Sequence, residues 1–339
     1  MRQIPKIILL DPKEMQARLN SILLKEGFTT DRALQCAEVF TTNSVDGIYT
    51  HGINRFPRFV KYLKEGYVKV DAEPTLENKY GGIEQWNGNL APGISNALFA
   101  TDHVTGLAQK HGIGCVTLKN TNHWMRGGTY GWKAAKAGCV FISWTNTIAN
   151  MPAWGAKDAR LGNNPLVMAI PHKEEAIVLD MAVSQFSYGA IELAAIKNET
   201  LSVYGGYDNE GSLTKEPSKI LASNRSLPIG YWKGSGLALL LDLLATILSG
   251  GLATYEITNK EIESEVSQVF IAIDISKLGN HSSIAKIIEN ILNDYHHSMP
   301  EDELKKIVYP GEKVLHTRQN NLTNGIPVLE KIWDEINQL

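Results

Sequence analysis

Residues 113–144, IGCVTLKNTNHWMRGGTYGWKAAKAGCVFISW, decide the fold class of this chain. The apolar run at 113–118 predicts a buried strand, residues 131–137 predict a helix, and residues 140–144 predict the next strand. The same patterns predict further strands at 81–88, 166–170, 176–181 and 269–275, and a helix at 91–111. Strands that alternate with helices predict an α/β sheet with helices packed on its faces.

Both ends of the chain predict helices instead. Asp11 and Pro12 are typical of a helix start, and the apolar residues that follow recur at helical spacing until Gly27. Further helices are predicted from residue 30, over 54–64, over 237–248 as a buried helix, and from 282 to the C-terminus including 327–339, whereas 201–228 is expected to be a long ordered loop. We therefore expect two domains, a helical one from residues 1–75 and 282–339 and an α/β one from residues 76–281.

Composition and charge narrow the functional classes. The chain has 339 residues, is 43% hydrophobic and has a net charge of −3, which gives no electrostatic basis for binding nucleic acid or an anionic membrane. Cys36, Cys115 and Cys139 have apolar neighbours and form no Cys-x-x-Cys pair, so we expect buried thiols in a reducing compartment, the cytoplasm. The apolar stretch 237–248 is too short to span a bilayer. The histidines lack ligand spacing, so no metal site is expected.

The segment 49–59, YTHGINRFPRF, is the first candidate for chemistry. His51 can give or take a proton near neutral pH, and Arg55 can bind a carboxylate with two parallel hydrogen bonds. Their spacing places them on one face if the segment is helical. The alternative, more common for such a pair, is a helix start in which Thr50 is the N-cap and Arg55 is solvated.

Polar side chains also follow the predicted strands. Residues 120–130 are dense in Asn, His, Trp and Arg directly after a strand, where ligands bind in α/β sheets. His123 is the candidate there, and a surface turn with a satisfied histidine is the alternative. Asp180 ends another strand and can orient a histidine or an amide, or cap the following turn.

A Rossmann fingerprint, Gly-x-Gly-x-x-Gly, is absent from the chain. Lys233 and the small residues 234–236 precede a long apolar helix, and a helix N-terminus beside a lysine is suited to phosphate. The alternative is a Gly-rich turn in front of a core helix.

Together, the segments THGINRF (50–56), NHWMRGG (122–128), LDMA (179–182) and GYWKGSG (230–236) resemble the malate/L-lactate dehydrogenase family, which lacks a Rossmann fold. The matching segments keep the same order over nearly the whole chain. The resemblance implies a non-Rossmann, NAD(P)-binding α/β (α+β) fold, with a mixed sheet covered by helices and a helical domain that carries the catalytic histidine.

The resemblance also implies residue roles. His51 would be the proton donor to the carbonyl oxygen that is reduced, and Thr50 and Arg55 would bind the substrate's carboxylate and oxygens. His123 would line the substrate pocket, and Asp180 would be a positioning residue beside the nicotinamide. The family's cofactor contacts fall on Ala176, Ile177, Val178, Leu179, Asp180, Met181, Ala182, Trp232, Lys233, Gly311, Glu312 and Lys313.

The activity implied by the resemblance is reduction of the 2-keto group of a small sugar acid or 2-oxoacid by NADH, or by NADPH. Trp124 and Trp232 favour a member that acts on a sugar acid over malate or ureidoglycolate dehydrogenases. Family members are homodimers or larger, with the active site near the subunit interface. Alternatives are a reductase or dehydrogenase for malate, lactate, ureidoglycolate or a cyclic imine acid, a catalytically silent sugar-acid binding protein, and a structural module.

Overall fold

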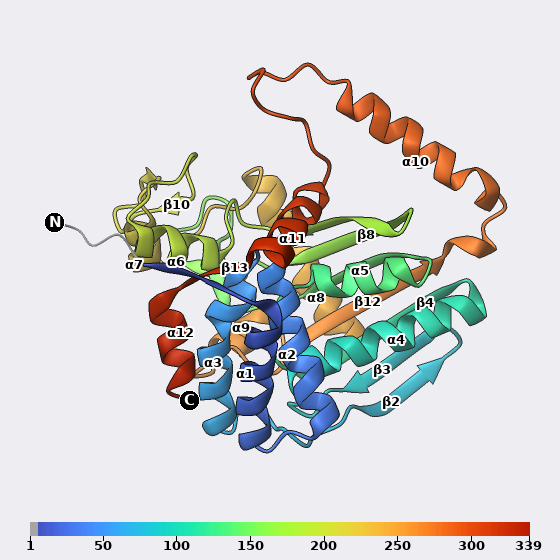
Figure 1. Ribbon diagram of the computed structural model, residues 1–339, viewed down its shortest axis with the longest axis horizontal. Coiled ribbons are helices and arrows are strands. Elements are labelled where there is room, and N and C mark those ends of the chain that lie inside the picture. The colour runs from blue at the N-terminus through green and yellow to red at the C-terminus, as the bar shows by residue number, and fades with distance from the viewer. Residues whose placement is uncertain (1–5) are drawn as a thin grey trace.

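The computed structural model describes residues 6–339, so the first five residues of the predicted helical domain lie outside the described part. Its centre is a seven-stranded sheet in the order β2-β3-β4-β12-β5-β8-β9 (Figure 1). The strands are β2 (Thr75–Tyr80), β3 (Ile83–Asn87), β4 (Ile113–Thr121), β12 (Val266–Asp274), β5 (Cys139–Thr145), β8 (Leu166–His172) and β9 (Glu175–Met181). Strands β3 and β4 pair in parallel and every other neighbouring pair is antiparallel. The predicted mixed, non-Rossmann sheet is therefore confirmed.

Helices cover both faces of the sheet, as expected from the alternating pattern. On one face lie α4 (Gly93–His111) and α5 (Gly128–Lys136), which pack on Phe141 and Phe270. On the other face lies α8 (Trp232–Ser249), which packs on Trp144 and Val269 (Figure 1). Neighbouring residues of β5 and β12 thus alternate between two apolar layers, as a pleated strand requires when both of its faces are buried.

Helix α8 differs from the predicted buried helix. It begins five residues earlier than expected, and its outer face carries exposed apolar side chains: Leu239 (49% exposed), Leu240 (57%), Leu243 (46%), Leu244 (43%) and Ile247 (70%). By length and apolar composition alone α8 could cross a membrane, although a core helix meets the same criterion. Asp242 accepts hydrogen bonds from Asn146 Nδ2 and the Thr254 amide, both at 2.9 Å, which tie this helix to the sheet domain.

The helical layer beside the sheet is built from both ends of the chain. It contains α1 (Pro12–Lys25), α2 (Thr30–Val45), α3 (Phe56–Lys64), α11 (Glu312–Asn324) and α12 (Glu330–Asn337). Asp11 caps α1 as predicted, accepting from the amides of Lys13 and Glu14. Phe40 of α2 packs on Phe56 and Phe59 of α3, with ring centroids 5.1 and 5.3 Å apart.

A two-stranded sheet joins the two ends of the chain. Strand β1 (Ile7–Leu10) pairs antiparallel with β13 (Ile326–Leu329), so the helix predicted over residues 327–339 is wrong for its first three residues. Helix α10 (His281–His296) has no buried residue and lies apart from the other C-terminal elements (Figure 1). The predicted division into two domains stays a prediction.

Residues 183–230 form a small lobe rather than only a loop. Helix α6 (Tyr188–Lys197) packs on α7 (Pro217–Ser223) around Ile191, Leu201 and Ile220. The lobe also contains a short hairpin of β10 (Gly206–Tyr207) and β11 (Leu213–Thr214). The prediction of one long ordered loop at 201–228 is therefore wrong in part, because the segment is ordered but contains short helices and strands with little periodicity. The remaining elements are β6 (Ala149–Pro152), β7 (Ala159–Gly162) and α9 (Thr254–Thr258).

A buried carboxylate connects the helical layer to the sheet. Asp46, at the end of α2, is 1% exposed and accepts hydrogen bonds from Arg318 at 2.7 and 3.0 Å. Arg126, which precedes α5, donates to the same carboxylate. Both guanidinium groups lie over the Trp132 ring, at 4.7 and 5.3 Å from its centroid. Arg318 also reaches Glu175 of β9 at 3.3 Å.

We predict that Asp46→Asn destabilises the protein by about 3–5 kcal/mol, because two arginines lose the charge that compensates their burial. Urea unfolding followed by circular dichroism measures this free energy. The matched control is Asp158→Asn, since Asp158 pairs with Arg160 on the surface, with 60% and 75% of the two side chains exposed. That change should cost less than about 1 kcal/mol. Equal losses for the two variants would contradict the role assigned to Asp46.

Candidate active site

His51 lies in a segment that is pinned to α2. Two 3₁₀ turns, Tyr49–His51 and Ile53–Arg55, meet at Gly52 and lead into α3. A Cβ atom at Gly52 would lie 2.3 Å from Ser44 Oγ, so only glycine permits this approach. The condition that His51 and Arg55 lie on one continuous helix is therefore not met. The alternative in which Thr50 caps a helix is wrong, because Thr50 lies within the first turn.

Two hydrogen bonds fix the position of this segment along α2. Asn43 Nδ2 donates to the His51 carbonyl at 2.9 Å, and Ser44 Oγ accepts from the Ile53 amide at 2.8 Å. The Thr50 hydroxyl lies 3.5 Å from Nδ1 of His51. The backbone on either side of the imidazole is thus held by buried side chains.

His123 stacks on His51. Their ring centroids are 5.5 Å apart and their planes differ by 12°. The Met125 amide donates to His123 Nδ1 at 3.0 Å, so in the neutral ring the proton is on Nε2. His123 lies in the loop that follows β4, as the rule for strand ends predicts. The structure therefore brings together two histidines that are 72 positions apart in the chain.

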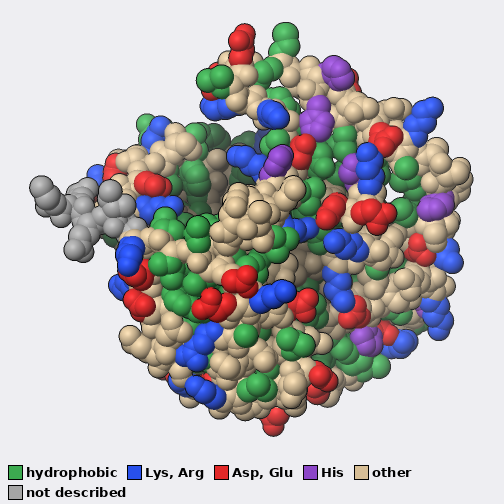
Figure 2. Space-filling model, viewed as in Figure 1, with side chains coloured by type: hydrophobic (Ala, Val, Ile, Leu, Met, Phe, Trp, Pro, Cys, Tyr) green, Lys and Arg blue, Asp and Glu red, His purple; other side chains and the backbone are tan. Residues whose placement is uncertain are grey.

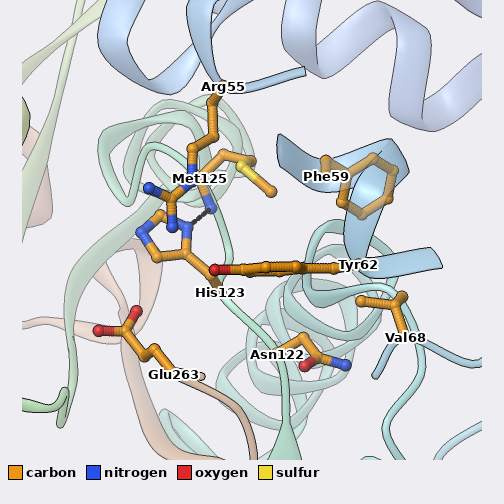
Figure 3. Close-up of a pocket in the computed structure, with 8 residues that line it drawn as sticks. All are labelled: Arg55, Phe59, Tyr62, Val68, Asn122, His123, Met125 and Glu263. Atoms are coloured by element: carbon orange, nitrogen blue, oxygen red, sulfur yellow. Dashed lines mark hydrogen bonds between the residues drawn. The ribbon is translucent and has the colours of Figure 1, made fainter. Parts of the chain in front are cut away.

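His123 lines a pocket together with charged and aromatic groups, and His51 stacks on the His123 ring. Its lining consists of Arg55, Phe59, Tyr62, Val68, Asn122, His123, Met125 and Glu263 (Figure 3). Burial, together with the charges of Arg55 and Arg126, lowers the pKa of His51 to about 4. Burial and the Arg55 charge also place the pKa of His123 well below its ordinary value. Both rings are therefore neutral at pH 7 in the free protein.

Asp180 ends β9 beside the start of α5. Its Oδ2 accepts from the Gly128 amide at 2.7 Å, which fixes one carboxylate oxygen. The side chain remains open to solvent although protein surrounds it on most sides. Desolvation raises the pKa of Asp180, and the Gly128 hydrogen bond and the Arg126 charge oppose that rise. The carboxylate is thus fixed but reachable, as a group that contacts a ligand must be.

The second predicted cofactor segment lies directly against β9. The Val178 amide donates to the Pro310 carbonyl at 3.1 Å, along the free edge of this edge strand. Gly311 has φ +94°, and a Cβ there would lie 3.2 Å from the Val178 nitrogen, so glycine is required for the contact. Glu312 accepts from His296 Nε2 and the Tyr309 amide, both at 3.0 Å, whereas Lys313 is exposed.

The third predicted segment begins α8 and adjoins the residues that follow β9. The Ile229 amide donates to the Val183 carbonyl at 2.8 Å, which places Trp232 and Lys233 one turn further on. Both side chains are exposed, and no side chain caps the N-terminus of α8. Uncapped amides beside a lysine are suited to a phosphate group. Figure 2 shows a hollow in the surface between the lobe of α6 and α7 and the segment of α10 and α11.

Some residues of the site carry no sequence signal. Glu263 lies in a polar segment before β12, and Asn43 and Asp46 look like ordinary helix-end residues. Tyr62 belongs to the helix 56–64 and is two positions from a core residue, Val60, so no pattern marks it as pocket-lining. Among residues 6–339, no group of three or more His, Cys, Asp or Glu side chains is placed to hold a metal ion.

Comparisons with known proteins place the chain in a family. A family model described as malate/L-lactate dehydrogenase matches residues 10–337. The 2,3-diketo-L-gulonate reductase of Citrobacter koseri is 43% identical over 328 residues, covering 96% of this chain and 98% of that protein. A 2,3-diketo-L-gulonate reductase of Escherichia coli is 42% identical with the same coverage.

Solved structures share the fold. Malate dehydrogenase from Entamoeba histolytica has a TM-score of 0.93 at 22% identity, covering 98% of this chain and 97% of that one. A putative malate/lactate dehydrogenase from Escherichia coli has a TM-score of 0.92 at 25% identity, covering 98% and 94%. The family is one of oxidoreductases with a nicotinamide cofactor, and its members include reductases and dehydrogenases. On this match over nearly its whole length, the chain belongs to the malate/L-lactate dehydrogenase family.

Proposed function

We propose that the protein reduces the 2-keto group of 2,3-diketo-L-gulonate to 3-dehydro-L-gulonate, with His51 as the proton donor. The observation that carries the chemistry is the stacking of His51 on His123, which lines a pocket together with Arg55. The substrate is supported by two relatives at 42–43% identity that are named 2,3-diketo-L-gulonate reductase. The reaction needs an acid next to the carbonyl oxygen, and an imidazole at this position supplies one.

Arg55 is proposed to bind the substrate's carboxylate. Arg55 is half-buried beside Glu263 and can offer parallel N–H groups that match a carboxylate. In the free protein its charge is one of the causes that lower the pKa of His51. A bound carboxylate offsets that charge, so the pKa of His51 rises when substrate binds. The bound carboxylate thus makes the protonated form of His51 easier to reach in the complex, against the effect of burial, which is the larger cause of its low pKa.

Thr50 and His123 are proposed to orient the reacting oxygen. The Thr50 hydroxyl lies near Nδ1 of His51 and restricts the ring to one orientation. His123 carries its proton on Nε2, because Nδ1 accepts from the Met125 amide (Figure 3). Its N–H can therefore donate to a substrate oxygen without competing for the proton on His51.

The predicted cofactor residues fit a nicotinamide dinucleotide, and we propose that they hold NADH. A bound cofactor supplies the hydride. Asp180 is accessible and fixed by the Gly128 amide, and Lys233 stands beside the uncapped N-terminus of α8, where a diphosphate is stabilised. The residues proposed to contact it are Ala176, Ile177, Val178, Leu179, Asp180, Met181, Ala182, Trp232, Lys233, Gly311, Glu312 and Lys313.

We also propose a homodimer in which α8 forms part of the interface. Its five exposed leucine and isoleucine side chains form an apolar face larger than single scattered residues explain. The same helix carries Lys233 at its N-terminus, so pairing through α8 would place the active site near the partner subunit. A cytoplasmic location is proposed as well, and the free thiols Cys36, Cys115 and Cys139 suit a reducing compartment.

The assay that tests the proposed function follows loss of NADH absorbance with the purified protein. We expect kcat/KM for 2,3-diketo-L-gulonate to exceed that for pyruvate, oxaloacetate and piperideine-2-carboxylate, and to be higher with NADH than with NADPH. Preference for another oxoacid would refute the substrate and leave the family chemistry in place. A protein that oxidises neither cofactor with any of these acids would instead be a silent binder.

Replacing the proposed acid should remove turnover without unfolding the protein. We predict that His51→Ala lowers kcat by about 100-fold or more, the usual contribution of a positioned general acid. Its thermal unfolding should stay close to wild type, because the backbone contacts to Asn43 and Ser44 remain. His316→Ala, on the exposed face of α11, is the control and should keep full activity. If His51→Ala retains turnover, the proposed acid is wrong.

The proposed interface predicts a change in molecular mass. Leu240→Glu combined with Ile247→Glu places two charges on the apolar face of α8. The wild type should therefore be a dimer and this double variant a monomer. Size-exclusion chromatography with light scattering measures this mass. Tyr80→Glu, at an exposed position of the edge strand β2, should leave the dimer intact. A wild-type protein with the mass of one chain would rule the interface out.

A further inference from the structure

Glu263 is a carboxyl group in the pocket that the proposed chemistry does not use. It belongs to the segment between α9 and β12 and lines the same pocket as Arg55 and His123. Figure 3 shows its carboxylate pointing into the pocket toward the His123 ring. Across the described residues 6–339, it forms no ion pair within 4.0 Å, and its carboxylate accepts a single long hydrogen bond, from the Ile148 amide at 3.4 Å.

A carboxylate in this position has a large unused capacity to accept hydrogen bonds. An ionised carboxylate offers about four acceptor sites, and one long contact with Ile148 leaves most of them open toward the pocket. Burial raises the pKa of Glu263, while the Arg55 charge opposes that rise. A purely structural glutamate would be expected to reduce its desolvation cost with a close ion pair, which Glu263 lacks within the described residues.

A second free polar group faces the same space. The Tyr62 hydroxyl, on α3, points into the pocket beside His123 and takes part in no hydrogen bond among residues 6–339 (Figure 3). The Asn122 Nδ2 group, in contrast, is engaged, since it donates to backbone carbonyls such as that of Leu90 at 2.8 Å. The pocket thus presents one acceptor, Glu263, and one hydroxyl, Tyr62, next to the proposed carboxylate and carbonyl contacts.

We propose that Glu263 selects the substrate by accepting a hydrogen bond from one of its hydroxyl groups. This inference rests on the proposed function and names the class of acid that the pocket prefers, a 2-oxoacid that carries hydroxyls. The carboxylate also disfavours the binding of other acids. A short oxoacid without hydroxyls leaves Glu263 unpaired, and a dicarboxylate such as oxaloacetate brings a second negative charge toward it.

The competing role is structural. Glu263 and Arg55 attract each other, so Glu263 could instead hold the Arg55 guanidinium in place. The two roles differ in what they predict. A residue that only positions Arg55 affects every substrate carboxylate alike, whereas a hydroxyl acceptor affects only acids with a hydroxyl. The ratio of kcat/KM for matched acids with and without a hydroxyl therefore separates them.

The experiment compares Glu263→Gln and Glu263→Ala with wild type on 2,3-diketo-L-gulonate, oxaloacetate, and the matched pair hydroxypyruvate and pyruvate. Glu263→Ala removes the charged acceptor and should lower kcat/KM by about 10- to 100-fold for the two hydroxylated acids, and Glu263→Gln, which keeps a neutral acceptor oxygen, should lower it by a smaller factor. The decrease in kcat/KM should arise mainly from a higher KM. Pyruvate should change less than about twofold, and Glu263→Gln should improve oxaloacetate because the repelling charge is gone.

Glu261→Gln is the control, since Glu261 lies two positions away, is exposed and bonds to the Tyr67 hydroxyl. It should leave all four kcat/KM values unchanged. Equal losses on pyruvate and hydroxypyruvate in the Glu263 variants overturn hydroxyl selection in favour of Arg55 positioning, and no loss on either overturns it as well. Failure of the wild type to reduce 2,3-diketo-L-gulonate refutes the proposed function separately, and the hydroxypyruvate to pyruvate ratio still decides the role of Glu263.

Discussion

The geometry of the site depends on the buried carboxylate of Asp46. It joins the end of α2 to Arg126, in the loop after β4, and to Arg318, in α11. Each of these elements also carries a part of the site. Helix α2 holds the backbone of His51, the loop contains His123, and α11 follows directly on Gly311, which lies against β9. A buried ion cluster of this kind adds little net stability over apolar packing. Any other arrangement of the three elements, however, would leave a buried charge without its partner, which is strongly destabilising.

The pocket is electrostatically prepared for an anion. Arg55 and Arg126 lower the pKa of His51, and Arg55 and Arg58 act in the same direction on His123. The free protein therefore holds its two imidazoles neutral at the cost of crowding positive charge around them. A carboxylate that enters relieves this repulsion and raises the pKa of His51, while burial, the largest cause of the low pKa, continues to act. Affinity for the substrate and readiness of the proton donor are thus coupled through the same arginine.

Sequence patterns predicted the parts of the fold that depend on local order. The β4–loop–α5–β5 unit and the capped start of α1 appear close to the predicted positions, because strand alternation and capping act over a few residues. The strand at 326–329 was missed, since its partner at 7–10 is about 320 positions away and no local pattern encodes that pairing. The exposed apolar face of α8 was not predicted either. An apolar run in the sequence has the same pattern whether the helix packs in the core or exposes one face.

The site was predictable only in part, for a related reason. His51, Arg55, His123 and Asp180 stand out because polar or ionisable residues follow strands or glycines in a recognisable order. Glu263 and Asp46 carry no such mark. Their importance comes from burial, and burial is a property of the tertiary fold: Asp46 matters because two distant arginines converge on it. Sequence reasoning finds the groups that do chemistry more easily than the groups that tune them.

The pairing of β1 with β13 makes the order of synthesis matter. Strand β13 follows β1 by about 320 positions, so the segment at 7–10 waits for all the intervening residues to be made before its partner leaves the ribosome. Contacts between such distant segments form late and slowly. A nascent chain could fold its sheet early, yet the layer that supports His51 would close last. The enzyme is therefore expected to gain activity only after residues 326–329 have been made, and loss of these residues would act on the N-terminal half of the described chain.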